Sequence, residues 1–323
     1  MVVLETVTVD AAGGPMGGAA RFREELHRYL ARNGRHDIRI IGLGRRLSPA
    51  WLLRREVATT RRTRRVALNN VGFVTSGGQR WTLLGNALHF LTEAEVHSLH
   101  PSLRSIATRQ ASIVRMAARR SDVLIAPCSA MADRVITTLP SVRNRVITRM
   151  HPVSVDLIPE RSSEKFILCP ILFAPYKCMP ERLTEWIAAV DDHIDPAVRL
   201  LVTATTEDVP PALAANRRIK LLGQLSVPGL CQFWARSQAI FFPTGLESFG
   251  FPLAEARAIG RPVIARNTEQ NKEIAGPALR AFVTGDKESL LQATKEALAT
   301  VVRPDPAPFD PDAYFDWMLG GLE

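Results

Sequence analysis

Cysteine is scarce in this sequence, and the few cysteines present lie far apart. None has the C-x-x-C or Cys/His spacing of a zinc site, and no disulfide framework is suggested. The four residues are Cys128, Cys169, Cys178 and Cys231. We therefore expect reduced thiols that pack as small hydrophobic side chains, and no structural metal.

Long apolar runs are also missing. None approaches the roughly 18 residues that a helix needs to cross a bilayer. The N-terminal residues 1–5 lead directly into an apolar segment, without a basic leader or a small-residue cleavage site. We expect the mature chain to start here and to be cytoplasmic, with peripheral contact at the inner membrane face as an additional prediction.

Positive charge is abundant but uneven. The formal net charge is +9, and arginines crowd the stretch Arg45–Arg65, which also contains Trp51, Leu52 and Leu53. No helix-turn-helix, RNA-binding or zinc-finger pattern accompanies them, so a nucleic-acid partner is not expected. The favoured interpretation is a solvated loop and helix face, and contact with an anionic membrane surface is the alternative.

The order of predicted elements indicates an α/β fold. A chain of 323 residues exceeds what one hydrophobic core usually organises, so two lobes are expected. Apolar strand-like runs alternate with amphipathic helix-like stretches, which is typical of parallel sheets covered by helices on both faces. The predicted strands span 2–8, 38–42, 122–126, 146–150, 166–169, 198–203, 239–242 and 262–265, and the predicted helices 19–33, 103–120, 181–190, 227–237 and 252–259.

We place three segments on this pattern. An N-terminal doubly wound lobe on the acceptor side spans 1–158, and a C-terminal nucleotide-sugar-binding lobe spans 159–303. A proline-rich connector and a short aromatic helix, 304–323, follow and are expected to pack back on the first lobe. Ligands of such sheets bind beyond the carboxyl ends of the strands, where the strand order reverses.

Two glutamates in the second half stand eight positions apart, with a turn between them. Glu247 follows a predicted strand, and Glu255 lies one turn inside a predicted helix. Pro252 suits the first turn of that helix, where the amides of Phe249, Gly250 and Phe251 are expected to face an anion. Glu255 can accept two hydroxyl hydrogen bonds, as a ribose diol requires, and Glu247 can stabilise positive charge at an anomeric carbon.

With these residues in place, the chain resembles the retaining glycosyltransferases that have two Rossmann-like lobes facing a cleft, the GT-B fold, and within them family 4. Their signature is a pair of glutamates separated by seven residues, as in Glu247-Ser-Phe-Gly-Phe-Pro-Leu-Ala-Glu255. The resemblance continues through Gly260-Arg-Pro-Val-Ile-Ala265 and is strong over about residues 166–300.

The resemblance assigns roles to several further residues. Lys177 matches the lysine that binds the donor diphosphate, whereas Leu172 stands where many members carry an arginine. Another arginine, such as Arg266, would then share the phosphate charge. Gly17 and Gly18 match the glycine-rich turn near the donor phosphate.

A histidine and a serine in the first half also match positions of the family. His89 falls where members carry a histidine near the donor sugar, and a structural role is the alternative. Ser129 matches a serine at a strand end and is interpreted as structural, with a helix cap as its expected role.

The activity implied is transfer of a sugar, with retained anomeric configuration, from a nucleoside diphosphate sugar to an acceptor hydroxyl on a small molecule, glycan or lipid-linked compound. Glu247 and His89 would be catalytic, and no metal ion or cofactor is expected beyond the donor itself. Two alternatives stay open: a non-catalytic subunit that binds nucleotide-sugar, and a nucleotide-sugar epimerase of the same fold.

Overall fold

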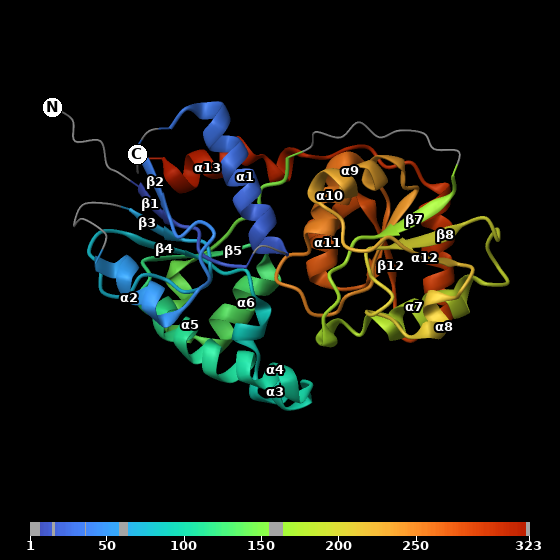
Figure 1. The fold of residues 1–323 in the computed structure, drawn as a ribbon, viewed down its shortest axis with the longest axis horizontal. Coiled ribbons are helices and arrows are strands. Elements are labelled where there is room, and N and C mark those ends of the chain that lie inside the picture. Colours follow the sequence, from blue (N-terminus) through green and yellow to red (C-terminus); the bar gives the residue numbers. More distant parts are fainter. Residues whose placement is uncertain (1–6, 15–16, 36, 58–63, 155–163, 321–323) are drawn as a thin grey trace. The chain divides into compact units, whose positions relative to one another are not determined.

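The computed structural model describes residues 7–14, 17–35, 37–57, 64–154 and 164–320. The chain forms two compact units (Figure 1). The first comprises Met1–Ser154, Glu247–Phe249 and Phe309–Glu323, and the second comprises Val155–Leu246 and Gly250–Pro308. The predicted lobe boundary at 158 falls outside the described residues. The three residues Glu247–Phe249 are thus grouped with the first unit, although the segments on both sides of them belong to the second.

The first unit is built on a sheet of six parallel strands in the order β2-β1-β3-β4-β5-β6. The strands are β1 (Val7–Asp10), β2 (Ile38–Ile41), β3 (Arg65–Ala67), β4 (Arg80–Leu83), β5 (Val123–Ala126) and β6 (Val146–Thr148). The strand order reverses between β1 and β3, so the glycine-rich turn after β1 lies at the position where such sheets bind ligands. The sequence did not reveal β3 or β4, because both are short and begin with arginine.

Helices of the first unit follow most of the predicted positions. They are α1 (Gly18–Asn33), α2 (Pro49–Val57), α3 (Glu93–Ser98), α4 (Pro101–Ser105), α5 (Ala111–Ala118), α6 (Ser129–Thr138) and α13 (Pro311–Leu319), with the short turns η1 (Ala87–Phe90), η2 (Ile106–Gln110) and η3 (Pro140–Arg145). The predicted helix 103–120 contains a π-helical turn, η2. The cap prediction for Ser129 is wrong: Cys128 is the N-cap of α6, no side chain caps it, and Ser129 is the first helical residue.

The C-terminal helix α13 packs on α1 of the same unit (Figure 1). The ring of Phe22 on α1 meets the rings of Tyr314 and Phe315 edge-on at 5.6 Å. The Tyr29 hydroxyl donates to the Asp316 carboxylate at 2.5 Å. Aromatic burial supplies most of this contact, since each such ring removes roughly 150–250 Å² from water.

The second unit is built on another sheet of six parallel strands, in the order β12-β11-β10-β7-β8-β9. The strands are β7 (Phe166–Cys169), β8 (Arg199–Val202), β9 (Ile219–Leu221), β10 (Ala239–Phe242), β11 (Val263–Arg266) and β12 (Leu279–Phe282). Here the order reverses between β7 and β10. Segments that leave the carboxyl ends of these two strands are therefore the expected ligand-binding segments of this unit.

Helices cover both faces of the second sheet. They are α7 (Met179–Val190), α8 (Pro211–Ala214), α9 (Val227–Arg236), α10 (Phe251–Ile259), α11 (Glu269–Ala275) and α12 (Lys287–Ala299), with the turns η4 (Pro175–Lys177), η5 (Gly276–Ala278) and η6 (Ala307–Phe309). Trp186 of α7 packs on Phe241, and Phe233 of α9 packs on Phe166. Two parallel six-stranded sheets confirm the predicted α/β class.

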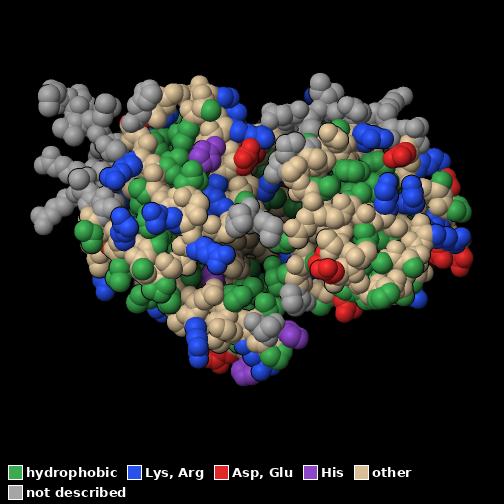
Figure 2. Space-filling model, in the orientation of Figure 1, with side chains coloured by type: hydrophobic (Ala, Val, Ile, Leu, Met, Phe, Trp, Pro, Cys, Tyr) green, Lys and Arg blue, Asp and Glu red, His purple; other side chains and the backbone are tan. Residues whose placement is uncertain are grey.

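Three arginines of the stretch Arg45–Arg65 are buried, so the prediction that the whole stretch is solvated is wrong. Arg55 bonds Asp10, and Arg64 donates to the carbonyl of Met318 at 3.0 Å while its guanidinium lies 4.6 Å from the Trp81 ring. Arg65 donates to the Gly77 carbonyl. Arg61 and Arg62 lie outside the described residues. Arginine and lysine side chains are spread over both units on the face shown in Figure 2.

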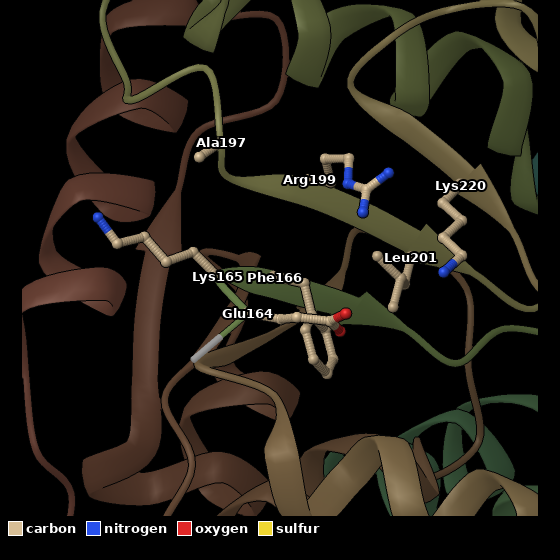
Figure 3. A pocket seen from close by; sticks show the side chains of 7 residues that line it. All are labelled: Glu164, Lys165, Phe166, Ala197, Arg199, Leu201 and Lys220. Atoms are coloured by element: carbon tan, nitrogen blue, oxygen red, sulfur yellow. The ribbon is translucent and has the colours of Figure 1, made fainter. Parts of the chain in front are cut away.

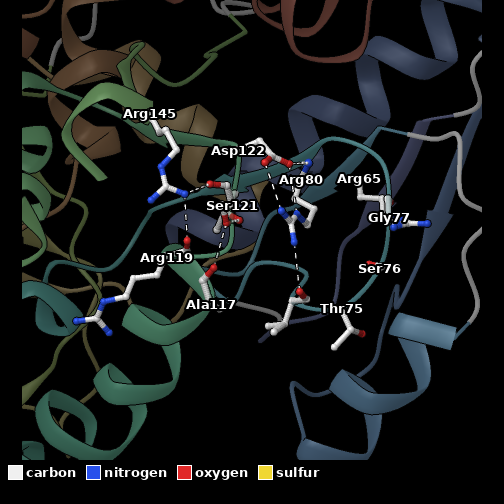
Figure 4. Close-up of polar contacts among 12 residues, drawn as sticks. Arg65, Thr75, Ser76, Gly77, Arg80, Ala117, Arg119, Ser121, Asp122 and Arg145 are labelled. Carbon is white, nitrogen blue, oxygen red and sulfur yellow. Dashed lines mark hydrogen bonds and ion pairs between the residues drawn. The ribbon is translucent and has the colours of Figure 1, made fainter. Parts of the chain in front are cut away.

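Arginines also form hydrogen bonds and an ion pair near the amino ends of strands in the first sheet (Figure 4). Arg80, at the start of β4, pairs with Asp122 and donates to the carbonyl of Val74. Arg145 donates to the carbonyls of Arg119 and Ser121. These contacts replace water at backbone carbonyls that end helices and turns, which is a structural use of the positive charge.

Thiol environments differ among the cysteines. Cys128 and Cys169 are buried, as expected for small hydrophobic side chains, whereas Cys178 is exposed, so the packing prediction is wrong for that residue. All four thiols are reduced. Burial raises the pKa of Cys169, and the Lys177 charge opposes this shift.

No helix among the described residues combines the length and the hydropathy that crossing a membrane requires.

Candidate donor site and catalytic residues

Lys177 lies in the loop that leaves the carboxyl end of β7. The turn η4 (Pro175–Lys177) holds it, with the Lys177 amide donating to the Ala174 carbonyl at 2.9 Å. Its charge acts on Cys169, the last residue of β7, so the ammonium group lies near the end of that strand. Leu172, in the same loop, is 46% exposed. The loop therefore presents one cation, and an apolar side chain stands where the resemblance placed a second.

The helix α10 (Phe251–Ile259) starts just beyond the carboxyl end of β10. Gly250 is its N-cap, in the left-handed conformation with φ of 87°, and Pro252 occupies the first turn. A Cβ on Gly250 would lie 3.0 Å from Leu253 and 3.1 Å from Phe242. Conformation and packing thus both require glycine at position 250. The first amides of α10 have no carbonyl partner within the helix, as at any helix N-terminus.

Glu255 is the fifth residue of α10 and is 8% exposed. Most residues of this helix are buried, so the carboxylate is held on a fixed backbone close to the anion-attracting end of the helix. A buried carboxylate needs hydrogen-bond donors, and the hydroxyl groups of a ribose are suitable ones. Lys177, Gly250, Phe251 and Glu255 all belong to the second unit, at the ends of β7 and β10.

The segment Glu247–Phe249 contacts other residues of the first unit. The Ser248 hydroxyl donates to the Gly85 carbonyl at 2.9 Å, and the Cys128 thiol donates to the Ser248 carbonyl at 3.3 Å. The Phe249 ring is buried, 4.9 Å from the His151 ring. The Phe249 side chain therefore holds this segment in place. In the same segment, Oε1 of Glu247 is buried.

His89 belongs to the same unit and lies in η1, which follows β4 and the Gly85 loop. It is 6% exposed, and its backbone carbonyl accepts from Arg115 at 2.8 Å. Burial lowers the pKa of His89 to about 4, and the Arg115 charge adds to this shift. His89 is thus a neutral imidazole near pH 7, four residues beyond the carbonyl that accepts from Ser248.

The glycine-rich turn after β1 is described only in part, because Pro15 and Met16 lie outside the described residues. Gly17 is the N-cap of α1 with φ of 76°, and both Gly17 and Gly18 are exposed. The Arg23 guanidinium donates to the Gly14 carbonyl and holds the start of the turn. Exposed amides at the start of a 16-residue helix fit the predicted approach of an anion.

Asp10, at the carboxyl end of β1, is a buried carboxylate that the sequence analysis missed. Its oxygens accept from the amide of Ala12, the indole of Trp51, the guanidinium of Arg55 and the amide group of Asn69. Four donors satisfy it, so its role is to fix α2 and the loop after β3 beside the glycine-rich turn. The sequence signal that could have indicated this residue is an apolar strand that ends in an aspartate.

A cavity of about 220 Å³ lies elsewhere in the second unit (Figure 3). Lys165, Phe166, Arg199 and Leu201 line it, together with Lys220. It opens near the amino ends of β7 and β8, whereas ligands of such sheets bind at the carboxyl ends. Its volume is also below the roughly 300–1,000 Å³ of small-molecule sites. We therefore exclude it as the donor site.

Part of the second half of the chain matches a known protein family. Residues 172–300 match the family model of glycosyl transferases group 1, a range that contains Lys177, both glutamates and Arg266. No curated protein sequence matches the chain.

Solved structures resemble the whole chain at low sequence identity. WaaG, a glycosyltransferase involved in lipopolysaccharide biosynthesis, is 15% identical with a TM-score of 0.69, covering 98% of this chain and 100% of WaaG. S. aureus MnaA with UDP is 13% identical with a TM-score of 0.59, covering 99% and 98%.

An S. aureus TarM mutant, in complex with Fondaparinux, α-GlcNAc-glycerol and UDP, is 11% identical with a TM-score of 0.59. The match covers 81% of this chain and 53% of TarM, so the chain spans about half the length of that protein. At these identities the likenesses show the fold, and they agree with the predicted GT-B class.

Proposed function

We propose that this chain is a glycosyltransferase that moves a sugar from a nucleoside diphosphate sugar to an acceptor hydroxyl with retained anomeric configuration. The observation that carries the proposal is the convergence of Lys177, the start of α10 and Glu255 at the switch point of the second sheet, within the range that matches glycosyl transferases group 1. One cation, one helix N-terminus and one buried carboxylate suit a diphosphate linked to a ribose diol.

The reaction breaks the bond between the anomeric carbon and the diphosphate oxygen, and both electrons leave with the diphosphate. The acceptor oxygen forms the new bond on the same face of the sugar, and its hydroxyl proton passes to solvent water. Lys177 and the first amides of α10 would stabilise the negative charge on the leaving group, so the proposal needs no metal ion and no protonation of that group.

Glu247 and His89 complete the proposal from the first unit. A carboxylate stabilises the positive charge that develops at an anomeric carbon, which is the role proposed for Glu247. A neutral His89 would donate or accept a hydrogen bond to the sugar without adding positive charge, as its lowered pKa requires. Gly17 and Gly18 would approach the donor phosphate through backbone amides.

UDP is the first nucleotide to test, because two of the structural neighbours are solved with UDP. Acceptors that are small molecules, glycans or lipid-linked compounds remain within the proposal. Peripheral membrane contact through Arg45–Arg65 also remains a prediction, although its buried arginines leave a smaller surface than the sequence implied.

Binding and turnover separate the proposed roles. In calorimetry with UDP, GDP, ADP and dTDP, we expect Lys177→Ala and Glu255→Ala each to weaken the preferred nucleotide about 10- to 100-fold, since each removes a charged hydrogen-bonding group. Lys220→Ala, an exposed cation at the excluded cavity, is the matched control and should bind like the wild type. Unchanged affinity in both site variants would refute the donor site.

Turnover distinguishes the proposal from its alternatives. Glu247→Gln should lower nucleotide release from the donor sugar about 100-fold while nucleotide affinity stays near the wild-type value. An altered sugar and free nucleotide that appear without acceptor would indicate an epimerase. Binding without turnover across donors and acceptors would indicate a non-catalytic subunit.

A further inference from the structure

Arg266 is the last residue of β11 and lies at the carboxyl edge of the second sheet. β11 pairs in parallel with β10, with Ala265 opposite Phe242. On its other side β10 pairs with β7, which leads to Lys177. Arg266 therefore ends one of the two strands that flank β10, Lys177 lies in the loop after the other, and α10 begins beyond β10 itself.

The Arg266 guanidinium lies on Gly245, in the loop between β10 and α10. A Cβ placed on Gly245 would be 1.8 Å from Nη1 of Arg266, closer than any side chain could come. Gly245 is absent from the glycines with positive φ, so its backbone conformation is open to other residues. Glycine at this position is explained by the room it leaves for the guanidinium.

Arg266 lacks the partners that other arginines of the second unit have. Its Nε is buried and has no hydrogen-bond partner among the described residues. Arg182 nearby bonds Glu185 at 2.8 Å, and Arg257 pairs with Asp305 at 2.7 Å. The strand end thus holds a guanidinium whose charge no carboxylate of the described chain pairs with directly.

A second polar group, in the loop that follows β10, also lacks a hydrogen-bond partner among the described residues. Thr244, next to Gly245, is 3% exposed, and its hydroxyl has no hydrogen-bond partner among the described residues. Burying such groups without partners costs roughly 1–3 kcal/mol each, so their retention points to a ligand. Burial and the neighbouring Arg182 charge lower the pKa of Arg266, whereas the Glu185 charge raises it, and a bound anion would act in the same direction as Glu185.

We propose that Arg266, seated on Gly245 beside Thr244, binds the donor diphosphate from β11 and takes the place of the cation missing at Leu172. This inference rests on the proposed function and deepens it, because it identifies which side chains share the phosphate charge with Lys177. The phosphate oxygens would accept from the forked guanidinium, a geometry for which arginine is better suited than lysine.

The test compares a nucleoside diphosphate with its own nucleoside by calorimetry. The probe is whichever of UDP, GDP, ADP and dTDP the wild type binds most tightly. Arg266→Ala should weaken the diphosphate about 10- to 100-fold and leave the affinity for the nucleoside unchanged, because only the diphosphate contacts the guanidinium. Arg266→Lys should restore only part of this loss. The matched control is Arg199→Ala, which removes an exposed arginine at the opposite edge of the sheet.

Gly245→Ala tests the same contact without removing any charge. The added Cβ displaces the guanidinium, so this variant should also weaken the diphosphate selectively, and its far-ultraviolet circular dichroism should match that of the wild type. It provides the decisive measurement if Arg266→Ala fails to fold.

The outcomes separate the inference from the proposed function. If Lys177→Ala weakens the diphosphate but Arg266→Ala and Gly245→Ala do not, the role of Arg266 is refuted and the donor site stands. If the wild type binds none of the nucleoside diphosphates, both proposals are refuted. Equal losses of diphosphate and nucleoside affinity in Arg266→Ala would also overturn the phosphate role.

Discussion

Arg55 and Arg266 lie at the carboxyl ends of two similar sheets and are used in opposite ways. Arg55 pairs with buried Asp10, donates to two backbone carbonyls at 2.7 and 2.8 Å, and lies 4.5 Å from the Phe73 ring. Arg266 lies on a glycine, and among the described residues its guanidinium has neither an ion pair nor a backbone carbonyl partner, although the Nε of both arginines is buried without a partner there. An arginine bonded to a carboxylate and two carbonyls holds a loop in place, whereas one without such contacts is available to a ligand.

The largest expected effect tests the structural side of this comparison. Arg55→Ala should lower the free energy of unfolding by about 3–5 kcal/mol, because Asp10 would keep a buried charge without its cation. Arg54→Ala, the exposed neighbour on α2, is the control and should change it by less than about 0.5 kcal/mol. Urea denaturation measures both. A loss no greater than that of the control would show that Asp10 does not depend on Arg55.

Stability should respond differently at Arg266. Arg266→Ala removes a partly buried guanidinium that has no ion pair within the described chain, so the free energy of unfolding should stay within about 0.5 kcal/mol of the wild type or increase. The same urea series measures it. A loss comparable to that of Arg55→Ala would assign Arg266 a structural role and remove the contrast.

Acid sensitivity should be concentrated in the first unit, which contains both histidines with strongly lowered pKa values. Burial lowers the pKa of His151 to about 3 and that of His89 to about 4, below the ordinary 6.5. Between these values the unfolded chain binds more protons than the folded chain. The stability contributed by the neutral imidazoles is therefore complete above about pH 6.5 and is lost as the pH falls.

His151→Phe tests this dependence. His151 packs between Phe22 and Phe249, so phenylalanine suits the site and cannot be protonated. The decrease in unfolding free energy from pH 7 to pH 5 should be smaller by about 1–2 kcal/mol than in the wild type. His97→Gln, at an exposed histidine on α3, is the control. An unchanged decrease in His151→Phe would show that other groups cause the acid sensitivity.

The last prediction adds a cation instead of removing one. Leu172→Arg places a guanidinium on the loop that carries Lys177, at a side chain that is already 46% exposed. Nucleoside diphosphate affinity should rise about 3- to 10-fold, and more in an Arg266→Ala background than in the wild type. Equal gains in both backgrounds would indicate that the two positions do not serve the same phosphate group.

The sequence predicted the strands and the helix start that carry the proposed donor-site residues better than it predicted the elements of the first unit. Lys177, Gly250 and Glu255 follow apolar strands and a proline-marked helix start, which are local signals. The burial of Arg55 could not be inferred, because it depends on Asp10 lying 45 positions earlier. The short strands β3 and β4 were missed for a similar reason, since neighbouring strands bury residues that look solvated in the sequence.

The local sequence pattern also could not predict that residues 247–249 group with the first unit. A strand end followed by a helix start predicts one continuous turn, and the sequence gives no sign that Phe249 packs on His151 and Phe309. The contacts that decide this come from residues nearly a hundred positions before it and sixty after it.

This grouping limits how the gene can be divided. A fragment of residues 164–308 would contain the donor-binding residues, yet its Phe249 ring would lose His151 and Phe309 and be exposed to water. A fragment of residues 1–154 would lack α13 and leave Phe22 and Tyr29 without their aromatic cover. Recombinant expression, domain swaps and split reporters should therefore keep the chain intact from β1 to α13.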